Sequence, residues 1–207
     1  MTKHERGLKD LALDIHKAAK KQPHAKLWFP RRYPDDSYFV CDTARILKCS
    51  YFSELPLPSS DDLYGFEEFD YDSLLTRNLG TNNWVRVRLP SLDELNETKL
   101  LLRKIKETEG TDFDTLANRQ IRYYFKKPLW HFGGPRNYYR SDWIKKAIQA
   151  MKEPEAFINP NRSVCKWSFL YIRSKPDGTE LLILPFDADR FCVNPFWRTS
   201  KLEVYKD

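Results

Sequence analysis

A short turn sequence near the C-terminal end restricts how the chain can fold. The tripeptide Pro176-Asp177-Gly178 separates two runs, residues 164–173 and 179–186, that are rich in β-branched, aromatic and aliphatic side chains. Proline fixes φ and glycine accepts a positive φ, so the two runs are predicted to pair as a β-hairpin. Two further strands are expected at residues 191–196 and 202–205. The sequence therefore predicts a small antiparallel sheet at this end of the chain.

Helical patterns precede the hairpin. Thr2 and Glu5 form a capping box, and apolar residues follow at helical spacing, with His16 predicted on the solvated side. Ser91 and Glu94 repeat the capping box before a second periodic segment. A Gly-Gly turn at residues 133–134 is predicted to connect the last two helices. The four predicted helices run from Thr2 to Pro23, from Ser91 to Gly110, from Thr111 to Pro128, and from Ser141 or Asp142 to Met151.

Two short strands are predicted within this helical part. One covers residues 38–41, and the other covers residues 84–89, where the residue types alternate strictly. Alternation gives a strand two different faces. The apolar face carries Val85, Val87 and Leu89, and the cationic face carries Trp84, Arg86 and Arg88.

Together these patterns predict an α+β fold, with a mostly helical N-terminal two-thirds packed on a small C-terminal antiparallel sheet. The chain has 207 residues, of which 41% are hydrophobic, so it buries enough apolar surface to offset the entropy of the chain. We expect a single domain, residues 1–207. A subdivision into a helical part, residues 1–155, and an antiparallel β part, residues 156–207, is an alternative.

Several features bear on location and chemistry. No apolar run approaches the ~18 residues that cross a bilayer, and the N-terminal segment lacks the apolar centre of a signal peptide. The four cysteines form no C-x-x-C pair and are too sparse for a disulfide scaffold. We therefore expect an intracellular protein, cytoplasmic or nuclear, that contacts no membrane. No nucleophile elbow, Walker loop, zinc signature or dinucleotide fingerprint occurs, and no cofactor is expected in the leading hypothesis.

Charge is distributed in blocks of one sign. Residues 51–75 contain seven acidic side chains and no basic one, whereas residues 119–146 contain eight basic side chains and one acidic one. Such blocks are either held together by folding or used on partners. The acidic segment, residues 61–72, is expected to cover the basic segment within the molecule. The alternative is that it binds a protein partner.

Aromatic residues interleave with the basic ones in residues 119–146. Lys and Arg neutralise phosphates while aromatic faces accept unstacked bases, so this combination favours nucleic-acid binding, either DNA or RNA. The competing interpretation is a set of ordinary solvated helix faces. The predicted binding residues, with two from the cationic strand face, are Arg119, Arg122, Tyr123, Lys126, Lys127, Trp130, Arg136, Tyr138, Tyr139, Arg140, Arg86 and Arg88.

An enzyme hypothesis comes from a second pattern. Asp187 and Asp189 follow an apolar strand and are spaced so that both side chains project to one side, with Glu203 on the next predicted strand. Carboxylates in this arrangement are suited to Mg²⁺, so a Mg-dependent nuclease or nucleotidyltransferase is the alternative function. The simpler explanation is an Asp-rich turn. A third hypothesis is a protein–protein adaptor or assembly subunit, because Trp, Tyr and Arg also dominate protein interfaces.

Overall fold

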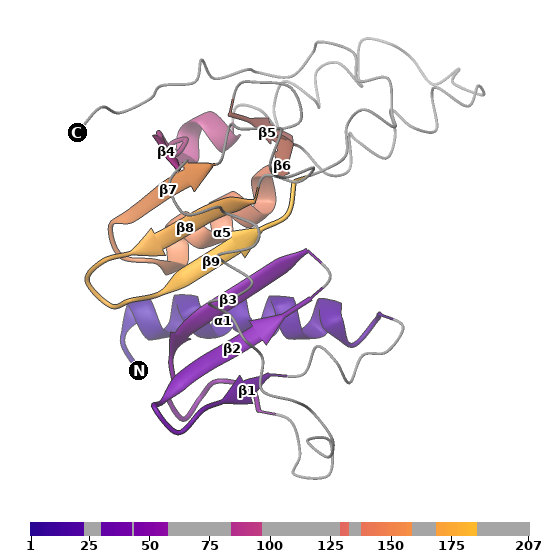
Figure 1. The fold of residues 1–207 in the computed structure, drawn as a ribbon, viewed down its shortest axis with the longest axis vertical. Coiled ribbons are helices and arrows are strands. Elements are labelled where there is room, and N and C mark those ends of the chain that lie inside the picture. The colour runs from indigo at the N-terminus through magenta and orange to yellow at the C-terminus, as the bar shows by residue number, and fades with distance from the viewer. Residues whose placement is uncertain are drawn as a thin grey trace.

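In the computed structural model, the chain forms a large antiparallel sheet with helices against one of its faces (Figure 1). The structure describes residues 1–22, 30–42, 44–57, 84–96, 129–132, 138–158 and 169–185. The elements in chain order are α1 (Lys3–Ala19), β1 (Arg31–Arg32), β2 (Ser37–Cys41), β3 (Arg45–Ser50), β4 (Val85–Val87), β5 (Leu129–His131), β6 (Tyr138–Arg140), α5 (Ser141–Ala150), β7 (Pro154–Ile158), β8 (Leu170–Ser174) and β9 (Glu180–Ile183). A helical turn over residues 92–96 follows β4.

The large sheet joins two parts of the chain that are far apart in sequence. Its seven strands lie in the order β1-β2-β3-β9-β8-β7-β4, and every neighbouring pair is antiparallel. The strands β1 to β3 and β7 to β9 each form a run of consecutive strands, and the two runs meet where β3 pairs with β9. A separate two-stranded sheet contains β5 and β6.

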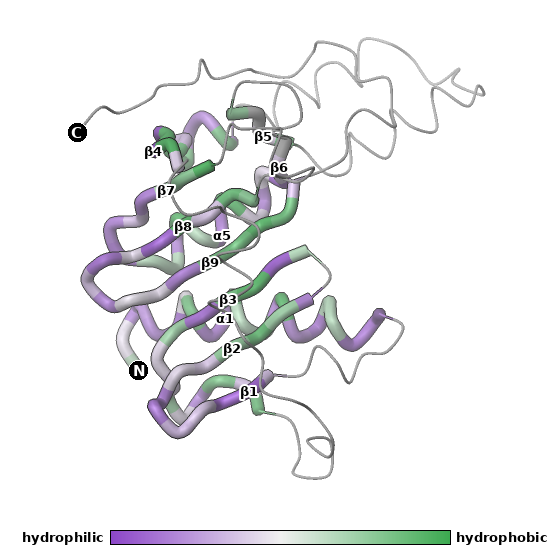
Figure 2. The backbone as a smooth tube through the Cα atoms, in the orientation of Figure 1, coloured by the Kyte–Doolittle hydropathy of each residue, from purple (hydrophilic) through white to green (hydrophobic). Residues whose placement is uncertain are grey.

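The first helix forms as its sequence predicts. The Thr2 hydroxyl accepts a hydrogen bond from the Glu5 backbone N–H, and the Glu5 carboxylate accepts one from the Thr2 backbone N–H. Leu8, Leu11 and Ile15 are buried, and hydrophobic and hydrophilic stretches alternate along α1 (Figure 2). The capping box and the apolar stripe are thus confirmed, and α1 packs against α5, β2 and β3.

The register of the sheet places the core on the side of the helices. The buried row that crosses the sheet on this side is Val87, Ala156, Ile172, Leu181, Leu47 and Val40. These side chains join Leu11 and Ile15 of α1 and Ile144 of α5 in one hydrophobic cluster. The members of this cluster extend from Leu8 to Ile183. The other side of the sheet, away from α1 and α5, is called the outer face below.

The predicted hairpin is confirmed as β8 and β9. Gly178 has a φ of +66°, as the turn requires. The Asp177 carboxylate accepts a hydrogen bond of 3.0 Å from the backbone N–H of Thr179. The backbone N–H of Ser174 closes the turn by donating to the Thr179 carbonyl at 2.8 Å. The strands predicted at residues 38–41 and within residues 84–89 are confirmed as β2 and β4.

The predicted fold class is wrong. The antiparallel sheet is large, and the first fifty residues, in which only residues 38–41 were predicted as a strand, supply three of its strands. In β3 the buried positions are Arg45, Leu47 and Cys49, so a charged residue occupies the core side of the strand. Because a buried arginine interrupts the apolar alternation, the pattern search finds no strand there.

Two other predictions of local structure are also corrected. Residues 129–131 and 138–140, on either side of the predicted Gly-Gly turn, pair as strands β5 and β6 and are not a simple connection between helices. The helix predicted from Ser141 or Asp142 to Met151 is confirmed as α5. His16 is buried, with 8% of its surface exposed, instead of solvated. The predicted helix at residues 111–128 and the strands at 191–196 and 202–205 lie outside the described residues. No helix in the described part of the chain combines the length and apolarity needed to cross a membrane.

Candidate functional site

The outer face carries aromatic and basic side chains where β4, β7 and β8 lie side by side. Alternation within each strand directs these side chains away from the helices. The register then brings them together, because Arg86 lies opposite Phe157, Phe157 opposite Tyr171, and Glu155 opposite Arg173. This group, the β4–β7–β8 surface, consists of Trp84, Arg86, Glu155, Phe157, Tyr171, Arg173 and Lys175.

Three cations of this surface converge on one carboxylate. Glu155 accepts hydrogen bonds from Arg173 at 3.2 Å, and it forms ion pairs with Arg86 at 3.1 Å and with the Lys175 ammonium at 3.4 Å. Partial burial acts to raise the pKa of Glu155, but Arg173, Arg86 and Lys175 outweigh it and hold this pKa below its usual range. The group of four side chains therefore has a net charge of +2 at neutral pH.

The three cations are also accessible. Their side chains are 42% exposed at Arg86, 39% at Arg173 and 66% at Lys175, whereas Glu155 is 14% exposed. The carboxylate thus lies beneath the cations, and the positive charge faces outward. Cations presented in this way attract anionic ligands.

Aromatic rings lie beside the cations. The Trp84 and Tyr171 ring centroids are 5.5 Å apart, and those of Phe157 and Tyr171 are 6.0 Å apart. The Arg173 guanidinium lies 4.6 Å from the centre of the Phe157 ring. All three rings are partly exposed. Burial and the neighbouring Glu180 carboxylate raise the pKa of Tyr171, so its hydroxyl stays neutral.

The basic character continues across the outer face toward β1. The row that contains Glu155 and Arg173 continues through Glu180, Lys48, Phe39 and Arg31. Together with Arg86 and Lys175, the charged residues of this face comprise five cations and two carboxylates. A smaller cluster centred on buried Phe39 and Leu182 forms the apolar part of the face.

The predicted binding residues are placed in several environments. Arg86 belongs to the β4–β7–β8 surface, whereas Arg88 forms a bidentate pair with Glu94 at 2.9 and 3.0 Å. This pair, with the backbone of Ser91, lowers the pKa of Glu94 to about 2. Arg140 pairs with Asp142 and lies 4.3 Å from the centre of the Trp143 ring.

Two of the predicted stacking residues lie in the core. Trp130 and Tyr139 are opposite each other in the β5–β6 pair and have 2% and 0% of their surface exposed. For Tyr138 only the backbone, in β6, is described. Arg119, Arg122, Tyr123, Lys126, Lys127 and Arg136 lie outside the described residues, as does the acidic segment 61–72.

Five members of the β4–β7–β8 surface did not emerge from the sequence as site residues. For Tyr171, Arg173 and Lys175 a signal is present, because residues 169–175 alternate between aromatic or basic and apolar or small. Glu155 and Phe157 have no such signal, since β7 is short and begins with Pro154. Their place in the surface follows from pairing with β4 and β8.

The residues of the enzyme hypothesis, Asp187, Asp189 and Glu203, lie outside the described residues. Within the described ranges, no three His, Cys, Asp or Glu side chains are grouped so that they could hold a metal ion. Burial raises the pKa of the Cys41 thiol to about 11 and that of the Cys49 thiol to about 12. Both thiols are therefore protonated at neutral pH and are poor nucleophiles.

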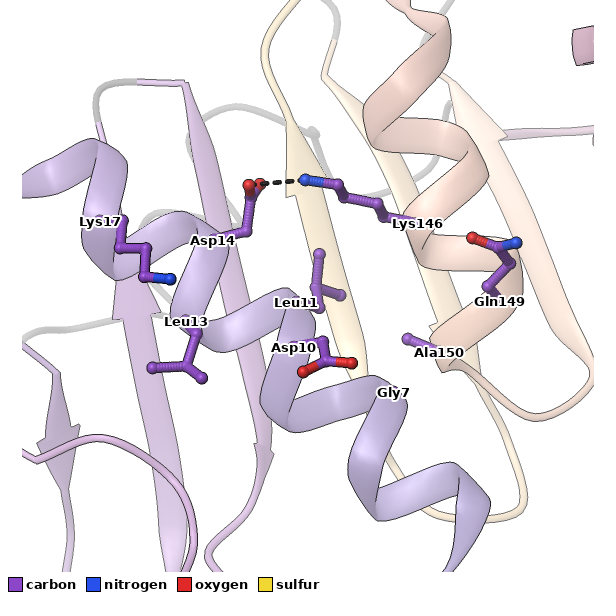
Figure 3. Close-up of a pocket in the computed structure, with 9 residues that line it drawn as sticks. All are labelled: Gly7, Asp10, Leu11, Leu13, Asp14, Lys17, Lys146, Gln149 and Ala150. Carbon is purple, nitrogen blue, oxygen red and sulfur yellow. Dashed lines mark ion pairs between the residues drawn. The ribbon is translucent and has the colours of Figure 1, made fainter.

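A groove of about 390 Å³ lies between α1 and α5 on the other side of the molecule (Figure 3). Its charged lining residues are Asp10, Asp14, Lys17 and Lys146. Asp14 is 2.6 Å from Lys146, and the two carboxylates and two ammonium groups cancel in net charge. The groove therefore lacks the excess charge found on the outer face.

The comparisons with known proteins give no further evidence on function. No protein-family model matches the chain, and neither a curated protein nor a solved structure matches it significantly.

Proposed function

We propose that the chain binds single-stranded nucleic acid on the β4–β7–β8 surface. The observation that carries the proposal is the presence of three partly exposed aromatic rings beside three exposed cations on one sheet face. Cations contact the phosphates, and ring faces stack on bases of any sequence. The same division of roles was the basis of the sequence hypothesis, and Arg86 is common to both.

The shape of the surface favours single strands over duplexes. Neighbouring strands are ~4.8 Å apart, so three strands make a nearly flat platform ~10 Å wide. Bases in a duplex are stacked and reached only through the grooves, which admit a helix or a narrow ribbon. A flat face instead contacts bases that are already unstacked. We expect both DNA and RNA single strands to bind, since none of these contacts involves the 2′-hydroxyl.

The test is to titrate labelled single-stranded and duplex oligonucleotides with the protein at several salt concentrations. Fluorescence anisotropy of the label measures binding. Arg173→Gln removes a phosphate contact, so we expect weaker binding and a salt slope shallower by about 0.7. Trp84→Ala removes a stacking surface, so we expect a loss of about tenfold with the salt slope unchanged. These two signatures separate the roles of charge and stacking.

Lys17→Gln is the matched control, because Lys17 lies in the groove between α1 and α5. This variant has the same charge change as Arg173→Gln and is expected to bind like wild type. The proposal is wrong if wild type does not bind at low salt, or if Lys17→Gln weakens binding as much as Arg173→Gln.

A further inference from the structure

The carboxylate of Glu155 occupies the position where three cations meet. In the register of the sheet, Arg173 is directly opposite Glu155, while Arg86 and Lys175 approach from the two diagonal positions. Both Glu155 oxygens are engaged, with Arg86 and Lys175 at Oε1 and Arg173 at Oε2. A phosphate group also offers several anionic oxygens to converging cations.

We infer that the Glu155 carboxylate competes with the phosphate of the nucleic acid for the three cations. This competition sets the affinity of the β4–β7–β8 surface. This inference rests on the proposed function. An incoming phosphate contacts the outward sides of Arg86, Arg173 and Lys175, while Glu155 holds the same cations from beneath. Each cation then divides its interactions between two anions. The phosphate therefore gains less binding free energy than it would without the carboxylate.

The competition also predicts selectivity. A single small anion gains only contacts that it shares with Glu155, because Glu155 is already held by three cations at 3.1 to 3.4 Å. A ligand that adds base stacking on Trp84, Phe157 or Tyr171 gains free energy that a lone anion does not. The surface is therefore expected to prefer an oligonucleotide strongly over inorganic phosphate at equal phosphate concentration.

Glu155→Gln tests the inference, since it keeps the size of the side chain and removes the charge. An exposed charge pair contributes up to ~1 kcal/mol, so we expect single-stranded oligonucleotides to bind roughly fivefold tighter. The salt slope should steepen by about 0.7, because one more phosphate is neutralised fully. Glu153→Gln is the matched control, as Glu153 is an exposed residue just before β7. It makes the same change in net charge and should bind like wild type.

The outcomes are distinguishable. If wild type binds and Arg173→Gln weakens binding, but Glu155→Gln binds no tighter than Glu153→Gln, the inference is wrong and the proposed function stands. If neither wild type nor Glu155→Gln binds at low salt, both are wrong. Equal urea midpoints for the variants and wild type show that the differences arise from binding. Should Glu155→Gln be less stable, Glu155→Asp, which keeps the charge, is expected to bind like wild type.

Discussion

Arg45 is the buried charge on which the central strands depend. Its side chain is 2% exposed and donates to the Asp42 carboxylate at 2.8 and 3.0 Å. It also contacts Asp14 of α1 at 2.6 Å and lies 4.5 Å from the centre of the Trp143 ring on α5. One side chain thus connects β3 with both helices. We predict that Arg45→Met destabilises the protein.

The size of the effect follows from what the substitution leaves behind. Removing one partner of a buried ion pair costs ~3–5 kcal/mol, because the other charge stays buried and unpaired. Asp42, 5% exposed, still accepts two backbone N–H groups at 2.7 and 2.8 Å. Asp14 still pairs with Lys146 at 2.6 Å. Because both carboxylates keep other partners, we expect the lower end of the range, about 3 kcal/mol.

Urea unfolding followed by tryptophan fluorescence measures this loss. With a slope of ~1–3 kcal/mol per M, a loss of this size lowers the midpoint by about 1–3 M. Lys48→Met on the outer face of the same strand is the control and should change stability by less than ~0.5 kcal/mol. Asp42→Asn combined with Arg45→Met should recover at least ~1 kcal/mol relative to Arg45→Met. A loss below ~1 kcal/mol for Arg45→Met would refute this reasoning.

Two further predictions concern helix packing and pH. In Gly7→Ala the added Cβ would lie 3.0 Å from the Ala150 Cα, so the cost of ~1–3 kcal/mol for overpacking exceeds the ~1 kcal/mol gained in helix propensity. We expect urea unfolding to show a net loss of about 1 kcal/mol in the free energy of unfolding. A gain in stability would contradict this, because it would mean that α5 shifts to make room for the added methyl group. Burial and the nearby Lys20 lower the pKa of His16 below its ordinary value of 6.5. As the pH falls below 6.5, His16 takes up a proton more readily in the unfolded state than in the folded state. Protonation therefore favours unfolding, and wild type loses stability over this range. His16→Gln should show a smaller loss between pH 7.5 and 5.5, whereas equal losses would contradict this assignment.

Local sequence signals predicted the elements that depend on short-range rules. The capping box of α1 and the Pro-Asp-Gly turn between β8 and β9 each involve residues only a few positions apart. The buried position of Val87 in β4 follows from alternation alone. The strand β3 escaped prediction because its core-side Arg45 is neutralised by Asp42 and Asp14. That compensation depends on tertiary contacts, which no periodicity shows.

The candidate site was predictable only in part. Arg86 and Trp84 were found from the alternation of a single strand, but they form a site only because β4 pairs with β7 and β7 with β8. The convergence of Arg86, Arg173 and Lys175 on Glu155 joins residues that are distant in sequence. Trp130 and Tyr139, which look like stacking residues in a basic segment, are core residues because β5 and β6 pair. Composition predicted a site of basic and aromatic residues, and the order of the strands determines which of these residues lie together.

Photochemical crosslinking tests the central claim most directly, because it identifies the protein residues that touch the bases. A single-stranded oligonucleotide containing 5-iodouracil is irradiated with the full-length protein, and the crosslinked peptides are identified by mass spectrometry. The account predicts crosslinks at Trp84, Phe157 or Tyr171, the aromatic residues of the β4–β7–β8 surface. Crosslinks that form in good yield but exclude β4, β7 and β8 would contradict it.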